Sequence, residues 1–221
     1  MGFLNKQKIS KTVIYYVSEV LIVIVGIFIA IQLNNWNENE KNKEDAINSL
    51  KRIKTDLNTE KFVLEDFKKD FNNSRNYLIN VAYNNNMSNL DSISQHFEAF
   101  IHYKMNSEYI NLKYSGKLNL ITNDKLRYNL VNYYEVYYAV YEEISEFHKT
   151  FINGRVEDYF QNEFPSDTTS LLNSEIVKLK LKDKMFQNLI KEQISSINFL
   201  NDKVKTERID SLTKWIDFEL K

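Results

Sequence analysis

One uninterrupted apolar stretch constrains this chain more than any other feature of its sequence. From Thr12 to Leu33 the sequence reads TVIYYVSEVLIVIVGIFIAIQL, with Glu19 as its only charged residue. At a rise of 1.5 Å per residue, a helix of this length spans about 33 Å, and the hydrocarbon layer of a bilayer is about 30 Å thick. A cleaved signal peptide has a shorter apolar region and a small-residue cleavage site. Residues 31–36 (IQLNNW) do not fit such a site, so we expect an uncleaved membrane anchor.

Charges on either side of this stretch predict its orientation. Three lysines precede it with no acid among them, and two glutamates follow soon after it: Lys6, Lys8, Lys11, Glu38 and Glu40. By the positive-inside rule, residues 1–11 lie in the cytoplasm, residues 12–33 cross the membrane, and residues 34–221 fold outside the cytoplasm.

Three residues of the apolar stretch form a candidate membrane interface: Glu19, Gly26 and Ala30. Gly26 and Ala30 are a small-xxx-small pair, which allows a second helix to approach closely. A carboxylate inside a bilayer is costly, so Glu19 either faces a partner or a polar cavity, or it reaches water at the interface near Lys11. Self-association or docking through this face and a plain tether both stay open.

Hydrophobic spacing of three and four residues predicts long helices in the rest of the chain. We expect them over about 37–82, 124–163 and 183–220. With only four glycines and one proline, sandwiches, barrels and glycine-looped nucleotide folds are disfavoured. The predicted fold is all-α: one transmembrane helix followed by an elongated antiparallel helical bundle with coiled-coil-like long helices. The expected core positions are Leu50, Ile53, Leu57, Leu64, Phe67, Phe71, Leu78 and Val81, with Glu60 and Ser74 in polar slots; Leu126, Leu130, Tyr133, Tyr137, Val140, Ile144, Phe147 and Phe151; and Phe186, Ile190, Ile194, Ile197, Val204, Leu212 and Trp215.

Local signals predict where shorter elements begin and end. Ser88 and Asp91 resemble a capping box that opens a short helix with Leu90, Ile93, Phe97, Phe100 and Ile101. Gly116 should end a second short helix over about 107–115, Asn123 should cap the long helix that follows, and Pro165 should end it. Residues 117–121 and 176–182 contain apolar and polar residues in alternation, so a small strand pair remains an alternative there.

The residues that carry chemistry are sparse. The chain has no cysteine and three histidines. His96 and His102 are six residues apart, which does not place them on one helix face as a metal pair, and Glu142, Glu143, Glu146 and His148 fit a solvated acidic face. No phosphate loop, nucleophile elbow or zinc motif occurs. We therefore expect no enzyme, no catalytic residues, no cofactor and no metal, and at a net charge of −1 no nucleic acid partner.

Tyrosines crowd the long helix near its middle. Tyr133 and Tyr137 fall in the predicted core, whereas Tyr134, Tyr138 and Tyr141 form a neighbouring stripe. This stripe is either part of a wide buried face or a partner surface, because tyrosine is enriched in interface cores. We carry Tyr134, Tyr138 and Tyr141 forward as a candidate partner surface.

Two segments resemble a known family. Residues 19–38 (EVLIVIVGIFIAIQLNNWNE) and residues 115–127 (SGKLNLITNDKLR) are similar to signatures of an uncharacterised family in Bacteroidota, domain of unknown function 6090. The family pattern has a glycine before the acid, where this chain has Ser18, and this difference puts very close helix packing there in doubt. The resemblance implies a single-span anchor in a Gram-negative inner membrane, and it implies no activity.

The expected function is that of a membrane-anchored structural or interaction protein of the bacterial envelope. It would act by helix–helix association with itself or with an envelope protein, with membrane lipid as a further partner. The alternative is an extracytoplasmic module that senses a small ligand and signals through a partner protein, although a small-molecule ligand is the less expected partner.

Overall fold

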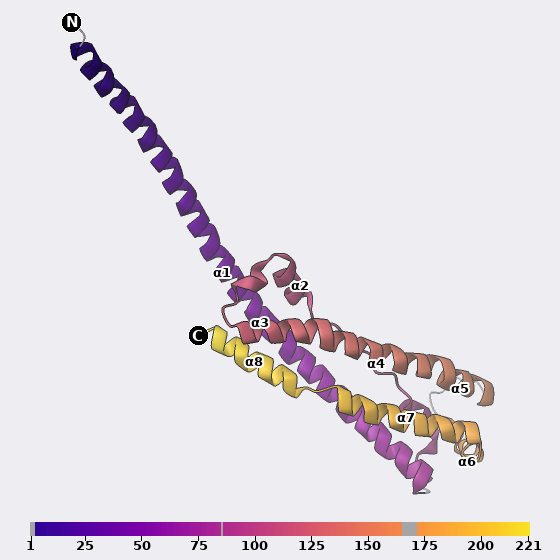
Figure 1. Cartoon of the computed structure of the whole chain (residues 1–221). Coiled ribbons are helices and arrows are strands. Elements are labelled where there is room, and N and C mark those ends of the chain that lie inside the picture. The colour runs from indigo at the N-terminus through magenta and orange to yellow at the C-terminus, as the bar shows by residue number, and fades with distance from the viewer. Residues whose placement is uncertain (1–2, 85, 165–171) are drawn as a thin grey trace. The chain divides into compact units, whose positions relative to one another are not determined.

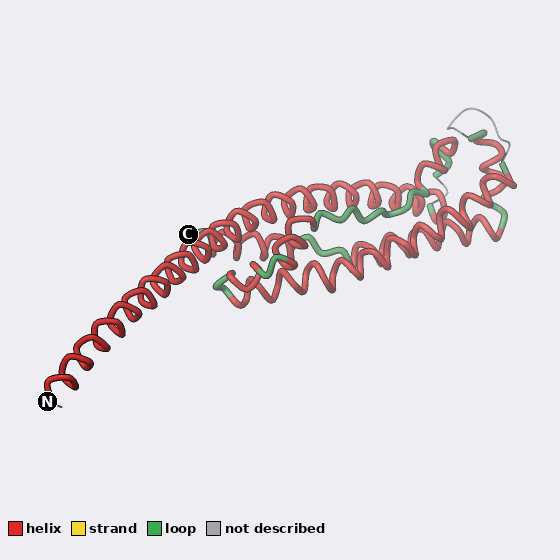
Figure 2. The backbone as a smooth tube through the Cα atoms, turned by 90° about the horizontal axis from the view of Figure 1, so that it is seen from above, coloured by secondary structure: helices red, strands yellow, loops and turns green. Residues whose placement is uncertain are grey.

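All regular secondary structure in the described residues is helical. The computed structural model describes residues 3–84, 86–164 and 172–221, and none of these lies in a strand (Figures 1 and 2). The all-α prediction is therefore confirmed. The strand-pair alternative is wrong, because residues 117–120 form the 3-10 helix η2 (Lys117–Leu120) and most of 176–182 lies in α6 (Ser174–Lys180). Asn173 caps α6 by accepting hydrogen bonds from the amides of the next turn.

The chain divides into two compact units, residues 1–48 and 49–221. Helix α1 (Phe3–Tyr83) contributes to both. Within the first unit, every side chain from residue 13 to residue 41 is exposed. The second unit is a helical bundle with its own buried core.

The second half of α1 confirms the predicted core spacing. Seven of the eight predicted apolar positions are buried, and Phe67 is half-buried. Of the two polar slots, Glu60 is buried and Ser74 is half-buried. Helix α1 therefore brings a carboxylate into the interior of the bundle.

Residues 124–163 form the predicted long helical segment, but two stretches of it are π-helical. Its parts are α3 (Asp124–Val131), the π segment η3 (Asn132–Tyr137), α4 (Tyr138–Thr150), the π segment η4 (Phe151–Val156) and α5 (Glu157–Glu163). Asn123 caps α3 as predicted, because its Oδ1 accepts a hydrogen bond from the Leu126 amide at 3.0 Å. The predicted end at Pro165 lies outside the described residues.

The first π segment shifts the buried face of the helix by one residue. A π turn holds one more residue than an α turn, so positions after η3 move forward in the seven-residue pattern. Tyr138, Tyr141, Ser145 and His148 are buried, whereas their predicted neighbours Tyr137, Val140 and Phe147 are half-buried or exposed. The predicted core positions 137, 140 and 147 are therefore wrong by one residue each.

The predicted last helix is two helices, α7 (Lys184–Lys203) and α8 (Glu207–Glu219). Between them Val204 has an extended backbone (φ −83°, ψ 102°), and its carbonyl oxygen accepts a hydrogen bond from Lys68 of α1 at 3.2 Å. Ile197 and Val204 are both buried and seven residues apart. The hydrophobic spacing therefore continues across the break, which is why the pattern did not reveal it.

Hydrogen bonds fix the directions of the helices in the bundle. Helix α1 is antiparallel to α7 and α8, because its successive side chains contact earlier and earlier residues: Lys54 with Asp217, Lys61 with Asp210, and Arg75 with Asn198. The segment α3–α5 is parallel to α1 instead, as Figure 1 shows, since Glu60 contacts Tyr138 and Phe71 contacts His148. The bundle is thus antiparallel in two of its three long pairings.

Parallel packing of α1 and α3–α5 requires a connection that returns along the bundle. This connection contains the 3-10 helix η1 (Leu90–His96), a non-helical stretch over residues 97–106 that we call the return segment, and α2 (Ser107–Tyr114). Figure 2 shows the return segment lying lengthwise among the helices. The predicted helix through Phe97 and Phe100 is therefore wrong beyond His96.

The predicted capping box is wrong as well. Asn89 precedes η1 with a left-handed backbone (φ 54°) and no side-chain cap. The Ser88 amide donates instead to Asn86 Oδ1 at 3.0 Å. In contrast, α2 ends where predicted, with Gly116 left-handed (φ 75°) just beyond it.

Candidate functional site

A polar cluster in the core surrounds Glu60 of α1. The Tyr138 hydroxyl donates a hydrogen bond to Glu60 Oε2 at 2.7 Å. On the other side, His102 Nε2 of the return segment lies 3.4 Å from Glu60 Oε1. Both the Glu60 and the His102 side chains are almost wholly buried. A buried carboxylate is costly unless it has such partners, so this cluster ties three separate elements together.

The candidate partner surface of Tyr134, Tyr138 and Tyr141 lies inside the bundle. Their exposed fractions are 5%, 2% and 0%, respectively. The rings of Tyr134 and Tyr138 pack edge-on at 5.0 Å, and His102 packs against Tyr138 and Tyr141 at 4.7 and 5.3 Å. Of the two interpretations of this stripe, the wide buried face is therefore the one that the structure shows, and the candidate partner surface is corrected because these three side chains are not exposed.

Burial acts strongly on the acidity of these tyrosines. Removal from water raises the pKa of the Tyr133, Tyr134 and Tyr138 hydroxyls far above the ordinary value, and the nearby Glu60 raises them further. A phenol in this setting stays protonated. The Tyr138 hydroxyl is therefore suited to donate its hydrogen bond to Glu60.

Side chains from the helices satisfy the polar backbone of the return segment. The Phe100 amide donates to His148 Nδ1 at 3.0 Å, and the Phe100 carbonyl oxygen accepts from Ser145 Oγ at 3.0 Å. The Met105 amide donates to the Tyr138 hydroxyl at 3.2 Å. Because a buried non-helical backbone has no ladder of its own, it needs such partners. Most buried polar residues of α4 therefore have a structural role.

His148 is the clearest case. Its Nδ1 accepts from the Phe100 amide, so Nε2 carries the proton and donates to Gln193 Oε1 of α7 at 2.8 Å. Burial lowers the pKa of His148, and the neutral ring agrees with both bonds. The predicted solvated face holds for the exposed Glu142, Glu143 and Glu146, but it is wrong for His148.

An open apolar groove lies between α4 and α7. We define the α4–α7 groove by the residues that line it: Val140, Glu143, Ile144, Phe147, His148, Glu192, Ser195, Ser196, Phe199, Leu200 and Lys203. Its volume is about 560 Å³. Two of its rings are largely exposed, Phe147 at 66% and Phe199 at 50%. The sequence placed Phe147 in the core, so this surface was missed. The π segment that displaced Phe147 could not be read from the spacing.

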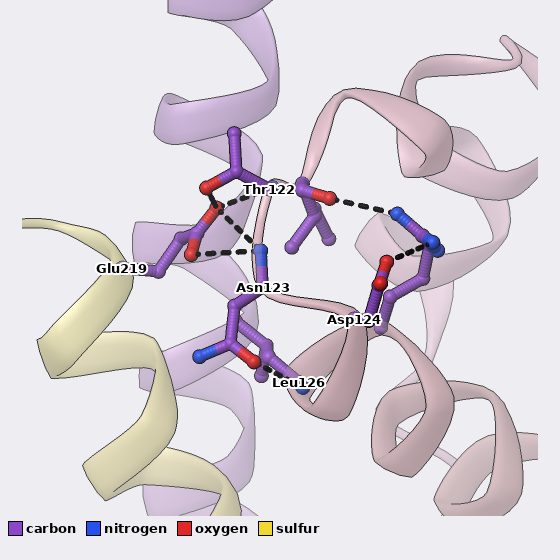
Figure 3. A network of polar contacts seen from close by, with 7 residues as sticks. Thr122, Asn123, Asp124, Leu126 and Glu219 are labelled. Atoms are coloured by element: carbon purple, nitrogen blue, oxygen red, sulfur yellow. Dashed lines mark hydrogen bonds and ion pairs between the residues drawn. The ribbon is translucent and has the colours of Figure 1, made fainter.

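The start of α3 is held by a carboxylate from the far end of the chain. As Figure 3 shows, Glu219 of α8 accepts hydrogen bonds from the amide and hydroxyl of Thr122, at 2.6 and 2.9 Å, and from the Asn123 amide at 3.2 Å. Arg127 donates to the Ile121 carbonyl oxygen at 2.9 Å and pairs with Asp124. Residues 121–127 thus form a compact capping structure.

The candidate membrane interface lies in the first unit. Glu19, Gly26 and Ala30 are exposed, and a Cβ atom placed on Gly26 would meet no described atom within 4 Å. Glu19 borders a shallow surface with Tyr16 and Val23. The part of α1 that starts at Val13 contains a window of mean hydropathy 2.5 with none of it buried, so by length and composition it is able to cross a membrane.

No group of three or more metal-ligating side chains is found in the part of the chain that the structure describes. The three histidines instead contact Ser74, Glu60 and Gln193, respectively.

Comparison with known proteins gives a family. A family model described as "Family of unknown function (DUF6090)" matches residues 19–203. The chain belongs to this family. No curated protein matches it, and no solved structure matches it.

Both sequence segments that resembled the family lie within the range matched to DUF6090. The structure shows the role of the second segment, residues 115–127, in this DUF6090 chain. Gly116 supplies the left-handed turn after α2, Asn123 caps α3, and Arg127 binds the Ile121 carbonyl oxygen. These residues fix how the connection enters the long helical segment, so they have a structural role in the fold.

Proposed function

We propose that this DUF6090 protein is a membrane-anchored, non-enzymatic structural or interaction protein of the bacterial cell envelope that acts through helix–helix association. The observation that carries the proposal is the apolar part of α1 that starts at Val13, where every side chain through residue 41 is exposed. Apolar side chains on every face of a helix are unfavourable in water but are expected in lipid. The structural partners of Glu60, Ser145 and His148 support a role without catalysis.

The proposed location is the inner membrane of a Gram-negative bacterium, with membrane lipid as one partner. The lysines before the apolar stretch favour a cytoplasmic N-terminus, and the bundle would then be periplasmic. Glu19, Gly26 and Ala30 would form the contact with a second copy or an envelope protein. A small residue such as Gly26 favours close approach of another helix.

Cross-linking through an introduced cysteine tests this membrane contact. The chain has no cysteine, so Leu33→Cys, seven residues from Gly26 and on the same helix face, would report only this contact. We expect oxidation of membranes to give a covalent dimer or a mixed disulfide. Gly26→Ile should lower its yield several-fold, because the added side chain separates the helices.

Val17→Ile is the matched control, since position 17 lies on the opposite helix face, and it should leave the yield unchanged. An equal yield in the Gly26→Ile and Val17→Ile proteins contradicts the proposed membrane contact.

A second candidate function is extracytoplasmic sensing of a small ligand through a partner protein. The observation in its favour is the α4–α7 groove, whose volume of about 560 Å³ falls in the range of small-molecule sites. Thermal-shift screening of the full chain in detergent tests this function. A saturable increase in melting temperature with one compound supports sensing, whereas a flat response to the whole library argues against it.

A further inference from the structure

The α4–α7 groove is an apolar surface without a partner inside the described chain. Phe147 and Phe199 face solvent from its two walls, and Val140 adds a third exposed apolar side chain. Contiguous apolar surface of this kind marks an interaction site more often than scattered exposed residues do. Ser195 and Ser196 on α7 leave room beside the rings, so a large side chain from outside could enter there.

The charged residues that line the groove can complement those of the same groove in a second copy of the chain. Glu143 lies on the α4 wall, and Lys203 and Glu192 lie on the α7 wall, where Glu192 is paired with Arg155 of the same chain. The Lys203 side chain is 46% exposed, and its ammonium group pairs with the adjacent Asp202 and lies 5.6 Å from the centre of the Phe199 ring in the groove. When a negative side chain lies on one wall of a groove and a positive side chain lies on the other, two copies of the groove related by a two-fold axis can pair these opposite charges.

We propose that the α4–α7 groove binds the same groove of a second copy of this chain. The contact would have a two-fold axis along the groove, so that α4 of one copy lies over α7 of the other. Phe147 of each copy then packs into the space beside Ser195 and Ser196 of the other. Glu143 of each copy faces Lys203 of the second, and both ion pairs form by symmetry.

The groove is small, so the contact needs a second source of stability. Stable complexes in solution bury about 800 Å² on each partner, and a groove of about 560 Å³ is a small contact by itself. Two chains held in one membrane meet at a much higher effective concentration than free chains do. The stability of the pairing therefore rests on the membrane anchoring in the proposed function. The location of the contact at α4 and α7 does not depend on that anchoring.

A single introduced cysteine tests the location of this contact. Full-length Ser196→Cys protein in native membranes should be cross-linked to a dimer by a short bismaleimide. Ser115→Cys, at an exposed position outside the groove, is the matched control and should give at least fivefold less dimer. Adding Phe199→Asp to Ser196→Cys should reduce the dimer to the control level. Equal yields at positions 196 and 115, or a yield that Phe199→Asp does not change, overturn the proposal.

Charge reversal tests the symmetry of the contact. Glu143→Lys and Lys203→Glu, each added to Ser196→Cys, should reduce the dimer severalfold, because each places like charges opposite one another. The double variant should restore the yield, since the reversed pair is again complementary. Failure of the double variant to recover overturns the two-fold arrangement. Loss of the Leu33→Cys cross-link with retention of the Ser196→Cys cross-link would refute the membrane contact alone, so the two proposals fail separately.

Discussion

At the scale of single residues, the bundle depends on a carboxylate in its core. Glu60 occupies a position that an apolar side chain fills elsewhere on α1, and it is kept there by the Tyr138 hydroxyl and by His102. Loss of a partner to a buried charged group costs more than an ordinary hydrogen bond contributes, since the remaining group is left without compensation.

Tyr138→Phe should therefore destabilise the protein. The change removes the donor to Glu60 and also the acceptor of the Met105 amide, and we expect the free energy of unfolding to fall by about 2–3 kcal/mol. Tyr128→Phe is the matched control, because Tyr128 is exposed, and it should have little effect. Urea unfolding followed by circular dichroism measures both. If the two variants are equally stable, Glu60 does not depend on Tyr138.

His148 makes stability dependent on pH with a defined sign. Burial lowers the pKa of His148 in the folded chain below its ordinary value of about 6.5. The unfolded chain then binds more protons, so the free energy of unfolding falls as the pH drops below about 6.5, by at most about 1.4 kcal/mol per pH unit. His148→Gln keeps an acceptor for the Phe100 amide and should show a smaller fall between pH 7 and pH 5. Parallel curves for the two proteins would contradict a neutral buried His148.

The sequence predicted these residues only in part. Glu60 and Ser74 stood out as polar slots in an apolar pattern along α1, and both do contact histidines. Their partners could not be found that way. His96 and His102 belong to the connection between α1 and α3, and hydrophobic spacing carries no information about contacts between segments distant in sequence.

At the scale of elements, the long helical segment over 124–163 was predictable from the sequence, but its register was not. Spacing along 124–163 predicted one helical segment and Asn123 as its cap, and both are present. The π turn in η3 accompanies the burial of Tyr134, Tyr138 and His148 on one face of the segment. Phe147 was therefore predicted on the wrong side of the helix, whereas of the two interpretations of the tyrosine stripe the wide buried face is the one present.

The cap of α3 supports a prediction of its own. Asn123→Ala removes the side-chain acceptor of the Leu126 amide, and we expect a loss of about 1 kcal/mol in the free energy of unfolding. Asn129→Ala is the matched control inside the same helix, where alanine is favoured over asparagine, so it should be neutral or slightly stabilising. Chemical denaturation of both proteins checks the difference. A control as destabilised as the cap variant would show that the cap is unimportant.

At the scale of the whole molecule, the account depends on the different surroundings of the two units. Residues 49–221 bury an apolar core, whereas residues 13–41 bury none of their side chains within the described chain. From one apolar stretch followed by seven-residue spacing, the sequence predicted a membrane anchor over residues 12–33 and a helical bundle after it. It could not predict that α1 and α3–α5 are parallel, because the return segment has no hydrophobic period to reveal it.

Alkaline carbonate extraction of native membranes, followed by intact mass measurement, tests the central claim most directly. A helix embedded in lipid resists extraction, whereas a peripherally bound chain is released. We predict that the protein stays in the membrane pellet with the mass of the full chain, 26.3 kDa. A shorter chain that lacks residues 12–33 and appears in the soluble fraction would contradict the account.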